Sequence, residues 1–278
     1  MKKHNCNFFV HPLTILYITI ALFTGRFSFL FIHLFVALIH ELSHMSMARA
    51  LHIPIEEMSM LPFGFYARMD HLEEYAWWKQ LLVVIAGPLS IFMSLAILLF
   101  FYHVDFLSIY GYKHGVEAAY TICFFNLIPI YPLDGARFLH LLIHHFFEES
   151  RARKISLGSS FLTTCIFGYF CATRGQWIVL FFLVLSQIKM GIQASYQYQR
   201  FLSLRLVQPK KKKVKIHHSI RLYRDYDNYY LSKQGRLYDE KFIINRYLQN
   251  YYQKTKKERR QRWKNFFLWK DRKNRKMT

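Results

Sequence analysis

The residues His40, Glu41 and His44 form an HExxH sequence inside a long apolar run from Phe27 to about His52. On a helix, the i, i+4 spacing places the two histidines on one face, one turn apart, so both imidazoles can reach a single metal ion. Glu41 stands about 100° round the helix from His40, near enough to act on a water at the metal without being a ligand. The motif therefore predicts half of a hydrolytic zinc site, which needs a further ligand.

The apolar setting of these polar residues adds weight to that prediction. Two histidines and a glutamate are costly to bury in lipid unless they face each other or a wet cavity. On the motif alone, two other interpretations stay open: an HExxH sequence that arises by chance, and a helix whose histidines only hydrogen-bond neighbouring backbone groups. The choice between them depends on a third ligand elsewhere in the chain.

Asp134 is the candidate for that ligand. Pro129 and Pro132 precede it and are expected to unwind a helix, and Gly135 follows it and allows close approach of the backbone. An aspartate at membrane depth is a functional candidate by default. The alternative is an aspartate that only caps a re-entrant turn. Two imidazoles and one carboxylate leave a fourth position for water, which is the composition of a hydrolytic zinc site.

The composition divides the chain into two unlike parts. The 278 residues are 53% hydrophobic and carry a formal charge of +21. From Arg200 to the end there are 25 Lys and Arg against 6 Asp and Glu, whereas the first 199 residues hold 13 against 11. We therefore expect residues 1–200 to form a transmembrane domain and residues 201–278 to form a basic cytoplasmic C-terminal region. The four cysteines show no CxxC spacing and predict neither a disulfide framework nor a thiolate zinc site.

The apolar segments of residues 1–200 predict an all-α polytopic membrane protein with about six transmembrane helices. The apolar segments cover residues 10–23, 27–52, 77–104, 118–147, 155–173 and 177–196. Basic residues gather between the fourth and fifth segments and after the sixth, so the positive-inside rule predicts that both termini are cytoplasmic. The second and fourth segments, which carry the HExxH motif and Asp134, then run in the same direction. Their candidate ligands are expected at similar depths, in the cytoplasmic half of the membrane.

Residues 53–76, between the second and third segments, alternate apolar and small residues around Gly64. This pattern predicts a short β-hairpin at the membrane face, and an ordinary amphipathic loop is the alternative. An open strand edge near the metal could pair with an unwound substrate as an added strand.

Together these motifs resemble those of the site-2 protease family of intramembrane zinc metalloproteases. The resemblance rests on the HExxH helix, on the segment from Asn126 to Gly135, and on Ala86-Gly87-Pro88. The chain also resembles the sporulation branch of that family at three places: His11-Pro12, Leu61 to Gly64, and Leu127, where most of the family has proline. The resemblance covers roughly residues 10 to 205.

The resemblance implies a role for each matching residue. His40, His44 and Asp134 would be ligands of Zn²⁺, and Glu41 would be the general base. Asn126 and Pro129 would contact the substrate.

The resemblance also implies a biological setting. The expected activity is regulated proteolysis of a membrane-associated precursor near the cytoplasmic face, and in the sporulation branch this is a sigma-factor precursor. The expected location is the bacterial cell membrane, with the membrane around the forespore as a candidate. Inhibitory or regulatory membrane proteins are expected partners.

The C-terminal region has two features. A strand–turn–helix pattern covers Asn228 to Leu248 and resembles, in position, the cystathionine-β-synthase-type regulatory domain of the sporulation branch. It is too short and too basic for a full nucleotide-binding module, so we interpret it as a reduced remnant. The basic run from Glu258 to Lys276 predicts contact with anionic lipid. An acidic protein is the second candidate, and nucleic acid is the least favoured.

Two other functions remain as alternatives. A membrane transporter or scaffold that binds a metal without protease activity would not require Glu41. A di-iron hydroxylase or desaturase would require several histidine boxes. His140, His144 and His145 have box-like spacing, but the remaining histidines supply no second box.

Overall fold

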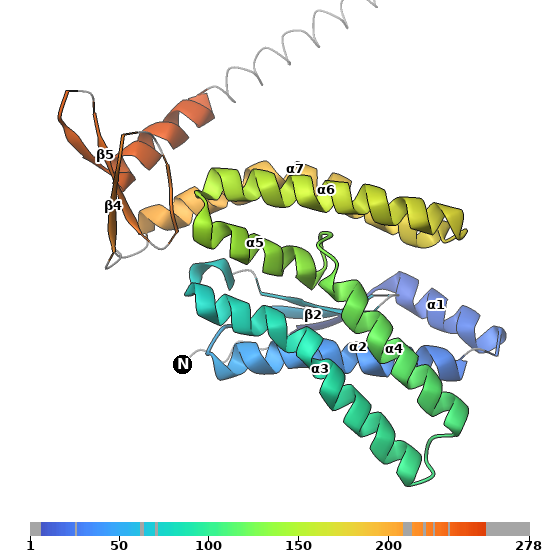
Figure 1. The fold of residues 1–278 in the computed structure, drawn as a ribbon. Coiled ribbons are helices and arrows are strands. Elements are labelled where there is room, and N and C mark those ends of the chain that lie inside the picture. Colours follow the sequence, from blue (N-terminus) through green and yellow to red (C-terminus); the bar gives the residue numbers. More distant parts are fainter. Residues whose placement is uncertain are drawn as a thin grey trace, which may run out of the picture. The chain divides into compact units, whose positions relative to one another are not determined.

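The computed structural model describes residues 7–25, 27–61, 64–69, 72–207, 213–218, 221–224, 226–232 and 234–253. Within these residues helices predominate, beside two three-stranded sheets (Figure 1). The long helices are α1 (Pro12–Phe23), α2 (Phe27–Ala50), α3 (Trp77–His103), α4 (Ile109–Leu127), α5 (Asp134–Phe146), α6 (Glu149–Thr173) and α7 (Trp177–Val207). A short 3₁₀ helix, η1, covers Leu72–Glu74, and a last helix covers residues 240–253.

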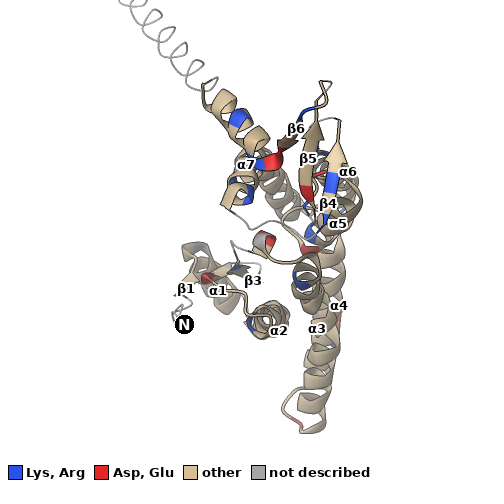
Figure 2. Ribbon diagram, turned by 90° about the vertical axis from the view of Figure 1, so that its left-hand side faces the viewer, with Lys and Arg blue, Asp and Glu red and all other residues tan. Residues whose placement is uncertain are grey.

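The chain divides into two compact units. Unit 1 comprises Met1–Phe146 and Ala152–Gly191, and unit 2 comprises Phe147–Arg151 and Ile192–Thr278. Among the described residues, four helices are long and apolar enough to cross a membrane: Phe27–Ala50, Trp77–His103, Glu149–Thr173 and Val179–Val207. In Figure 2 the ribbons of α3 and α4 are mostly without the colours of charged residues. These helices agree with the prediction of a polytopic membrane protein.

The predicted fourth segment differs from the observed structure in its start and in its continuity. Helix α4 begins at Ile109 rather than Ala118, because Ser108 caps it by accepting a hydrogen bond from the amide of Gly111 at 3.2 Å. The helix ends at Leu127, and α5 begins only at Asp134. Two prolines lie in this gap, where they cannot donate helical hydrogen bonds. The predicted unwinding before Asp134 is therefore confirmed.

Helix α2 ends in a Schellman motif that turns the chain toward the first sheet. His52 has a φ of 60°. Its amide donates to the carbonyl of Arg49 at 3.0 Å, and the amide of Ile53 donates to the carbonyl of Ala48 at 2.8 Å. Ile53 is buried directly after this turn. The end of the HExxH helix is thus locked to the segment that follows it.

The first sheet contains the predicted hairpin. Strands β2 (Glu57–Leu61) and β3 (Gly64–Arg68) pair antiparallel, with Met58 opposite Ala67. A third strand, β1 (Asn7–Val10), pairs parallel with β2 and was not predicted. The order β1-β2-β3 leaves β3 at an edge. A shared buried cluster packs the sheet against α2 and α3, and consists of Met45, Ala48, Ile53, Ile55, Met58, Ala67 and Val83.

Unit 2 contains the second sheet. Strand β5 (Asp227–Leu231) pairs parallel with β4 (Val214–His217) and antiparallel with β6 (Leu237–Asp239). Strand β5 and the helix that begins at residue 240 confirm the strand and the helix of the pattern predicted for Asn228 to Leu248, whereas β4 and β6 were not predicted. A small apolar core joins the end of α7 to the last helix and consists of Phe201, Leu202, Leu222, Ile244 and Leu248.

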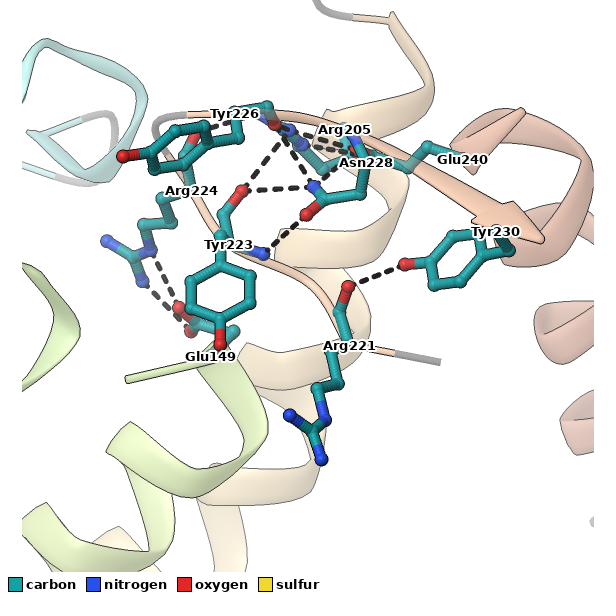
Figure 3. Close-up of polar contacts among 9 residues, drawn as sticks. All are labelled: Glu149, Arg205, Arg221, Tyr223, Arg224, Tyr226, Asn228, Tyr230 and Glu240. Carbon is teal, nitrogen blue, oxygen red and sulfur yellow. Dashed lines mark hydrogen bonds and ion pairs between the residues drawn. The ribbon is translucent and has the colours of Figure 1, made fainter. Parts of the chain in front are cut away.

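Buried ion pairs complete unit 2 (Figure 3). Arg205 donates to Glu240 through Nε at 2.5 Å and through Nη2 at 3.0 Å. The Asn228 side chain donates to the same carboxylate at 2.7 Å and also binds the backbone of Tyr223. Because Arg205 lies near the end of α7 and Glu240 begins the last helix, this network joins the two helices through the sheet.

Two further contacts hold the loop before β5. Arg224 forms a bidentate pair with the fully buried Glu149, at 2.8 and 3.0 Å. Tyr230 donates to the carbonyl of Arg221 at 2.7 Å. Burial, and after it the Glu240 carboxylate, raise the pKa of Tyr230, so its hydroxyl remains a donor. The loop is therefore held by charge-assisted and buried bonds rather than by apolar packing alone.

The buried pair gives a first prediction. Glu240→Ala should destabilise unit 2 by about 3 to 5 kcal/mol, because it leaves the Arg205 guanidinium buried without its carboxylate. Limited proteolysis of the full-length protein in detergent, with cleavage sites mapped to residues 192–253, measures the effect. Asn250→Ala, at an exposed position of the same helix, is the control. Equal cleavage rates for the two variants would contradict the prediction.

Candidate metal centre

The three predicted ligands meet in the interior of unit 1. Nε2 of His40 lies 3.1 Å from Oδ2 of Asp134, and Nε2 of His44 lies 2.9 Å from the same oxygen. All three residues are buried: His40 is 7% exposed, His44 is 5% exposed and Asp134 is 8% exposed. All three candidate ligand atoms lie within 4.8 Å of one another. The structure thus brings Asp134 to two histidines that lie 94 and 90 positions earlier in the chain.

Helix α5 presents Asp134 because its first turn packs unusually close to the end of α4. A Cβ atom placed on Gly135 would lie 2.1 Å from the carbonyl oxygen of Leu127, so a larger residue could not occupy this position. Ahead of it, the amide of Leu133 donates to the carbonyl of Ile130 at 2.8 Å. The predicted role of Gly135 in close backbone approach is confirmed.

Helix α3 supports His44 from the opposite side. Nδ1 of His44 lies 2.7 Å from the carbonyl oxygen of Val83. A Cβ atom on Gly87 would lie 2.1 Å from Nε2 of His44. The absence of a side chain at Gly87 therefore makes the space that the imidazole occupies. This gives a physical reason for the glycine in the Ala86-Gly87-Pro88 sequence.

The donor set fits a zinc ion. When Nδ1 of His44 carries the proton and donates to Val83, its Nε2 presents a lone pair toward the carboxylate. Such a bond from the second ring nitrogen to a backbone carbonyl is the usual support of a metal-binding histidine. Two neutral imidazole nitrogens facing one carboxylate oxygen are stable when a cation lies among them. Two nitrogens and one carboxylate are the donors of hydrolytic zinc sites.

Glu41 lies beside this group and is held by the sheet. Its Oε1 accepts a hydrogen bond from the amide of Ala67, in the edge strand β3, at 2.5 Å. The hydrogen bonds of the next residue show why this amide is available. The carbonyl of Arg68 accepts a hydrogen bond from the amide of Glu56, on the side of β2. Because the backbone groups of successive residues in a strand point to opposite sides, those of Ala67 point away from β2. The outward amide of Ala67 therefore faces Glu41 of α2.

The sequence interpretation missed three participants: Val83, Ala67 and Arg137. Nη1 of Arg137 lies 4.0 Å from Oδ1 of Asp134, and its side chain is 37% exposed. Its i, i+3 spacing from Asp134 is a signal that the sequence did contain. The contributions of Val83 and Ala67 come from backbone atoms, which residue types do not reveal.

The two predicted substrate contacts lie in the part of the chain that leads from α4 to Asp134. Asn126 is in the last turn of α4, where its Nδ2 donates to the carbonyl of Ile122 at 3.0 Å. Pro129 lies in the unwound segment between α4 and α5. Contact of either residue with a substrate stays a prediction.

Comparisons with known proteins agree with this arrangement. The profile of peptidase family M50 matches residues 28–122, which contain the HExxH motif. The chain is similar to stage IV sporulation protein FB of Bacillus subtilis, with 28% identity over 199 residues, covering 69% of each protein. It is also similar to a zinc metalloprotease of Methanocaldococcus jannaschii, with 33% identity over 135 residues, covering 46% of this chain and 38% of that protein.

A solved structure shares the fold. The site-2 protease from Methanocaldococcus jannaschii matches with a TM-score of 0.50 and 25% identity, over 65% of this chain and 88% of that chain.

The space at Gly87 gives a second prediction. Gly87→Ala should weaken zinc affinity by about 10- to 100-fold, because the new methyl group would displace the His44 imidazole. Zinc affinity is measured by competition with a chelating dye on the purified full-length protein. Gly158→Ala is the matched control, since a Cβ there meets nothing within 4 Å. If both variants bound zinc like the wild type, the assigned position of His44 in the centre would be wrong.

Proposed function

Since the chain belongs to the site-2 proteases of peptidase family M50, we propose that it cleaves a membrane-associated precursor protein near the cytoplasmic face of a bacterial membrane. The chain is a zinc metalloprotease of the site-2 type. The observation that carries the proposal is the convergence of Asp134, at the start of α5, with His40 and His44 of α2, a helix that also carries Glu41 and is long and apolar enough to span a membrane.

In this proposal His40, His44 and Asp134 hold the zinc ion. When bound, zinc supplies Lewis acidity that polarises a peptide carbonyl and makes water more acidic. The carboxylate of Glu41 receives a proton from the attacking water and then gives it to the nitrogen of the leaving amine. The Ala67 amide binds Oε1 of Glu41, which leaves Oε2 available for this proton. Arg137 supplies a positive charge near the Asp134 carboxylate.

The edge strand β3 supports a mode of substrate binding. A peptide bond inside a helix is hydrogen-bonded and shielded, so the substrate must unwind before cleavage. An unwound substrate can add as a strand to β3, whose outward groups lie on the side of Glu41. Asn126 and Pro129 would contact that strand.

The expected substrate is a sporulation sigma-factor precursor. This part of the proposal rests on the similarity to the Bacillus subtilis relative, whose name places that relative in sporulation. The corresponding location is the cell membrane or the membrane around the forespore, and inhibitory or regulatory membrane proteins are the expected partners.

The proposed topology has six membrane segments and two cytoplasmic termini. Besides the four long apolar helices, α1 is a shorter apolar helix, and α4 together with α5 forms the broken segment. Residues 1–200 would form the protease domain, and residues 201–278 would form the basic cytoplasmic region. Lys and Arg in that region would attract anionic lipid. The basic run from Glu258 to Lys276 lies outside the described residues.

The role of Glu41 gives a third prediction. Glu41→Gln should retain zinc at the wild-type stoichiometry and lower cleavage by about 10²- to 10⁴-fold, because the amide cannot accept the proton. The amide oxygen can still accept the hydrogen bond from Ala67, so the sheet should remain in place. The assay co-expresses the full-length protein with a membrane-associated sigma-factor precursor and follows the shortened product by immunoblot. Wild-type cleavage by the variant would rule out Glu41 as the base.

The role of Asp134 gives a fourth prediction. Asp134→Asn should lower both zinc content and cleavage, because a neutral amide is a poorer ligand than a carboxylate. Metal content is measured by atomic absorption on the same preparations that are assayed for cleavage. Unchanged zinc content and unchanged cleavage together would show that the third ligand lies elsewhere.

A further inference from the structure

The unwound segment before Asp134 has backbone groups that need partners. Tyr131 lies between Pro129 and Pro132, in the gap between α4 and α5, so it is not part of a helix whose own backbone could bind its amide and carbonyl. Within a membrane protein such groups must be satisfied by neighbouring protein, because lipid cannot satisfy them. The partners of Tyr131 come from α6 and α7, more than 25 residues further along the chain.

Three polar side chains bind both backbone groups of Tyr131. Its amide donates to Oγ of Ser160 at 2.9 Å, and that hydroxyl donates to Oε1 of Gln187 at 3.1 Å. Nε2 of Gln187 lies 3.3 Å from the carbonyl oxygen of Tyr131. The Ser186 hydroxyl shares its one proton between this oxygen, at 2.9 Å, and the carbonyl oxygen of Leu183 in its own helix, at 2.7 Å. The contacts form a closed ring, in which Ser160 orients the Gln187 amide so that its nitrogen faces the carbonyl. We name Ser160, Ser186 and Gln187 the loop clasp.

The burial of the loop clasp within apolar helices indicates that its hydrogen bonds are required by the structure. Helices α6 and α7 provide two of the four candidate membrane spans, and Ser160 and Ser186 are only 1% and 8% exposed. Polar side chains in membrane helices are costly unless they pair inside the bundle. Small hydroxyl residues also let helices approach closely and form hydrogen bonds between them.

The same segment also packs against its neighbours through apolar side chains. Ile130 and Leu133 are buried against Leu183 of α7. Packing of this kind is non-directional, so it sets how close the segment lies without setting its rotation. The amide and the carbonyl of Tyr131 belong to the two peptide units on either side of its Cα, so hydrogen bonds to both groups fix the orientation of both units. Only two residues separate Tyr131 from Asp134, so this orientation passes directly to the carboxylate.

We propose that the loop clasp positions Asp134 for zinc binding by fixing the backbone of Tyr131. The inference rests on the proposed function, in which Asp134 is a zinc ligand. Ser160, Ser186 and Gln187 are positioning residues that act through the backbone and touch neither substrate nor metal. Helices α6 and α7, which lie beyond the residues matched by the M50 profile, thereby complete the metal centre.

The test uses the full-length protein in detergent with two central variants. Ser160→Ala removes the bridge between the Tyr131 amide and Gln187, and Gln187→Leu removes the amide group while keeping similar volume. Zinc affinity should fall by about 10- to 100-fold in each, as is usual when a supporting contact of a metal ligand is lost. In the cobalt-substituted protein, the visible absorption band should shift because the carboxylate ligand is displaced.

Matched variants separate positioning from general stability. Ser159→Ala removes a neighbouring hydroxyl that binds the carbonyl of Ser156 in its own helix, so zinc affinity and the cobalt spectrum should stay at wild-type values. Ser160→Thr keeps the hydroxyl and should restore affinity. If Ser160→Ala and Gln187→Leu do not yield folded protein, Ser186→Ala carries the test, because it removes one of two donors to the Tyr131 carbonyl. A folded loop-clasp variant with the zinc affinity and cobalt spectrum of Ser159→Ala would overturn the proposal.

The outcome is distinguishable from failure of the proposed function. If Asp134→Asn binds zinc as tightly as the wild type, the ligand assignment itself is wrong, and the loop-clasp inference falls with it. If Asp134→Asn loses zinc while the loop-clasp variants retain it, only the positioning role is wrong.

Discussion

The structure of unit 1 depends on one carboxylate oxygen, Oδ2 of Asp134, which lies about equally close to Nε2 of His40 and Nε2 of His44. In a membrane interior three buried polar groups of this kind require one another and a cation, because neither lipid nor apolar packing can satisfy them. Each neighbouring element contributes to this convergence. Helix α2 sets the spacing of the histidines, α3 holds one ring and leaves space for it, and α5 begins at the carboxylate.

Close approach of backbones is what makes that convergence possible. Gly87 and Gly135 are the two positions where a single methyl group would collide with the centre or with its support. The collision at Gly87 would be with an imidazole, whereas that at Gly135 would be with a main-chain carbonyl, which has no freedom to move aside. The unwound segment between α4 and α5 shows the complementary requirement. Where the helix is interrupted, hydrogen-bonding side chains of α6 and α7 replace the missing backbone partners.

Unit 2 solves a different physical problem with buried charges. Its apolar core is small, and its charged pairs are deeply buried, in particular Arg205 with Glu240 and Arg224 with Glu149. Such pairs are weak sources of stability, but they strongly disfavour arrangements that separate their partners. The ends of α7, the loop before β5 and the last helix are consequently joined in one specific arrangement. This is consistent with a small basic unit that retains a defined fold despite its charge.

The sequence by itself determined the elements whose signals are local. The HExxH spacing follows from helical geometry, the interruption before Asp134 follows from two prolines, and the hairpin of β2 and β3 follows from alternation around Gly64. The match between Asp134 and the histidines could also be predicted, because the topology expected from the positive-inside rule gives their segments the same direction. Tertiary structure alone decided the contacts that use backbone atoms: the carbonyl of Val83, the amide of Ala67 and both groups of Tyr131. Every residue type carries the same backbone groups, so only the packing of distant segments shows which of them are used.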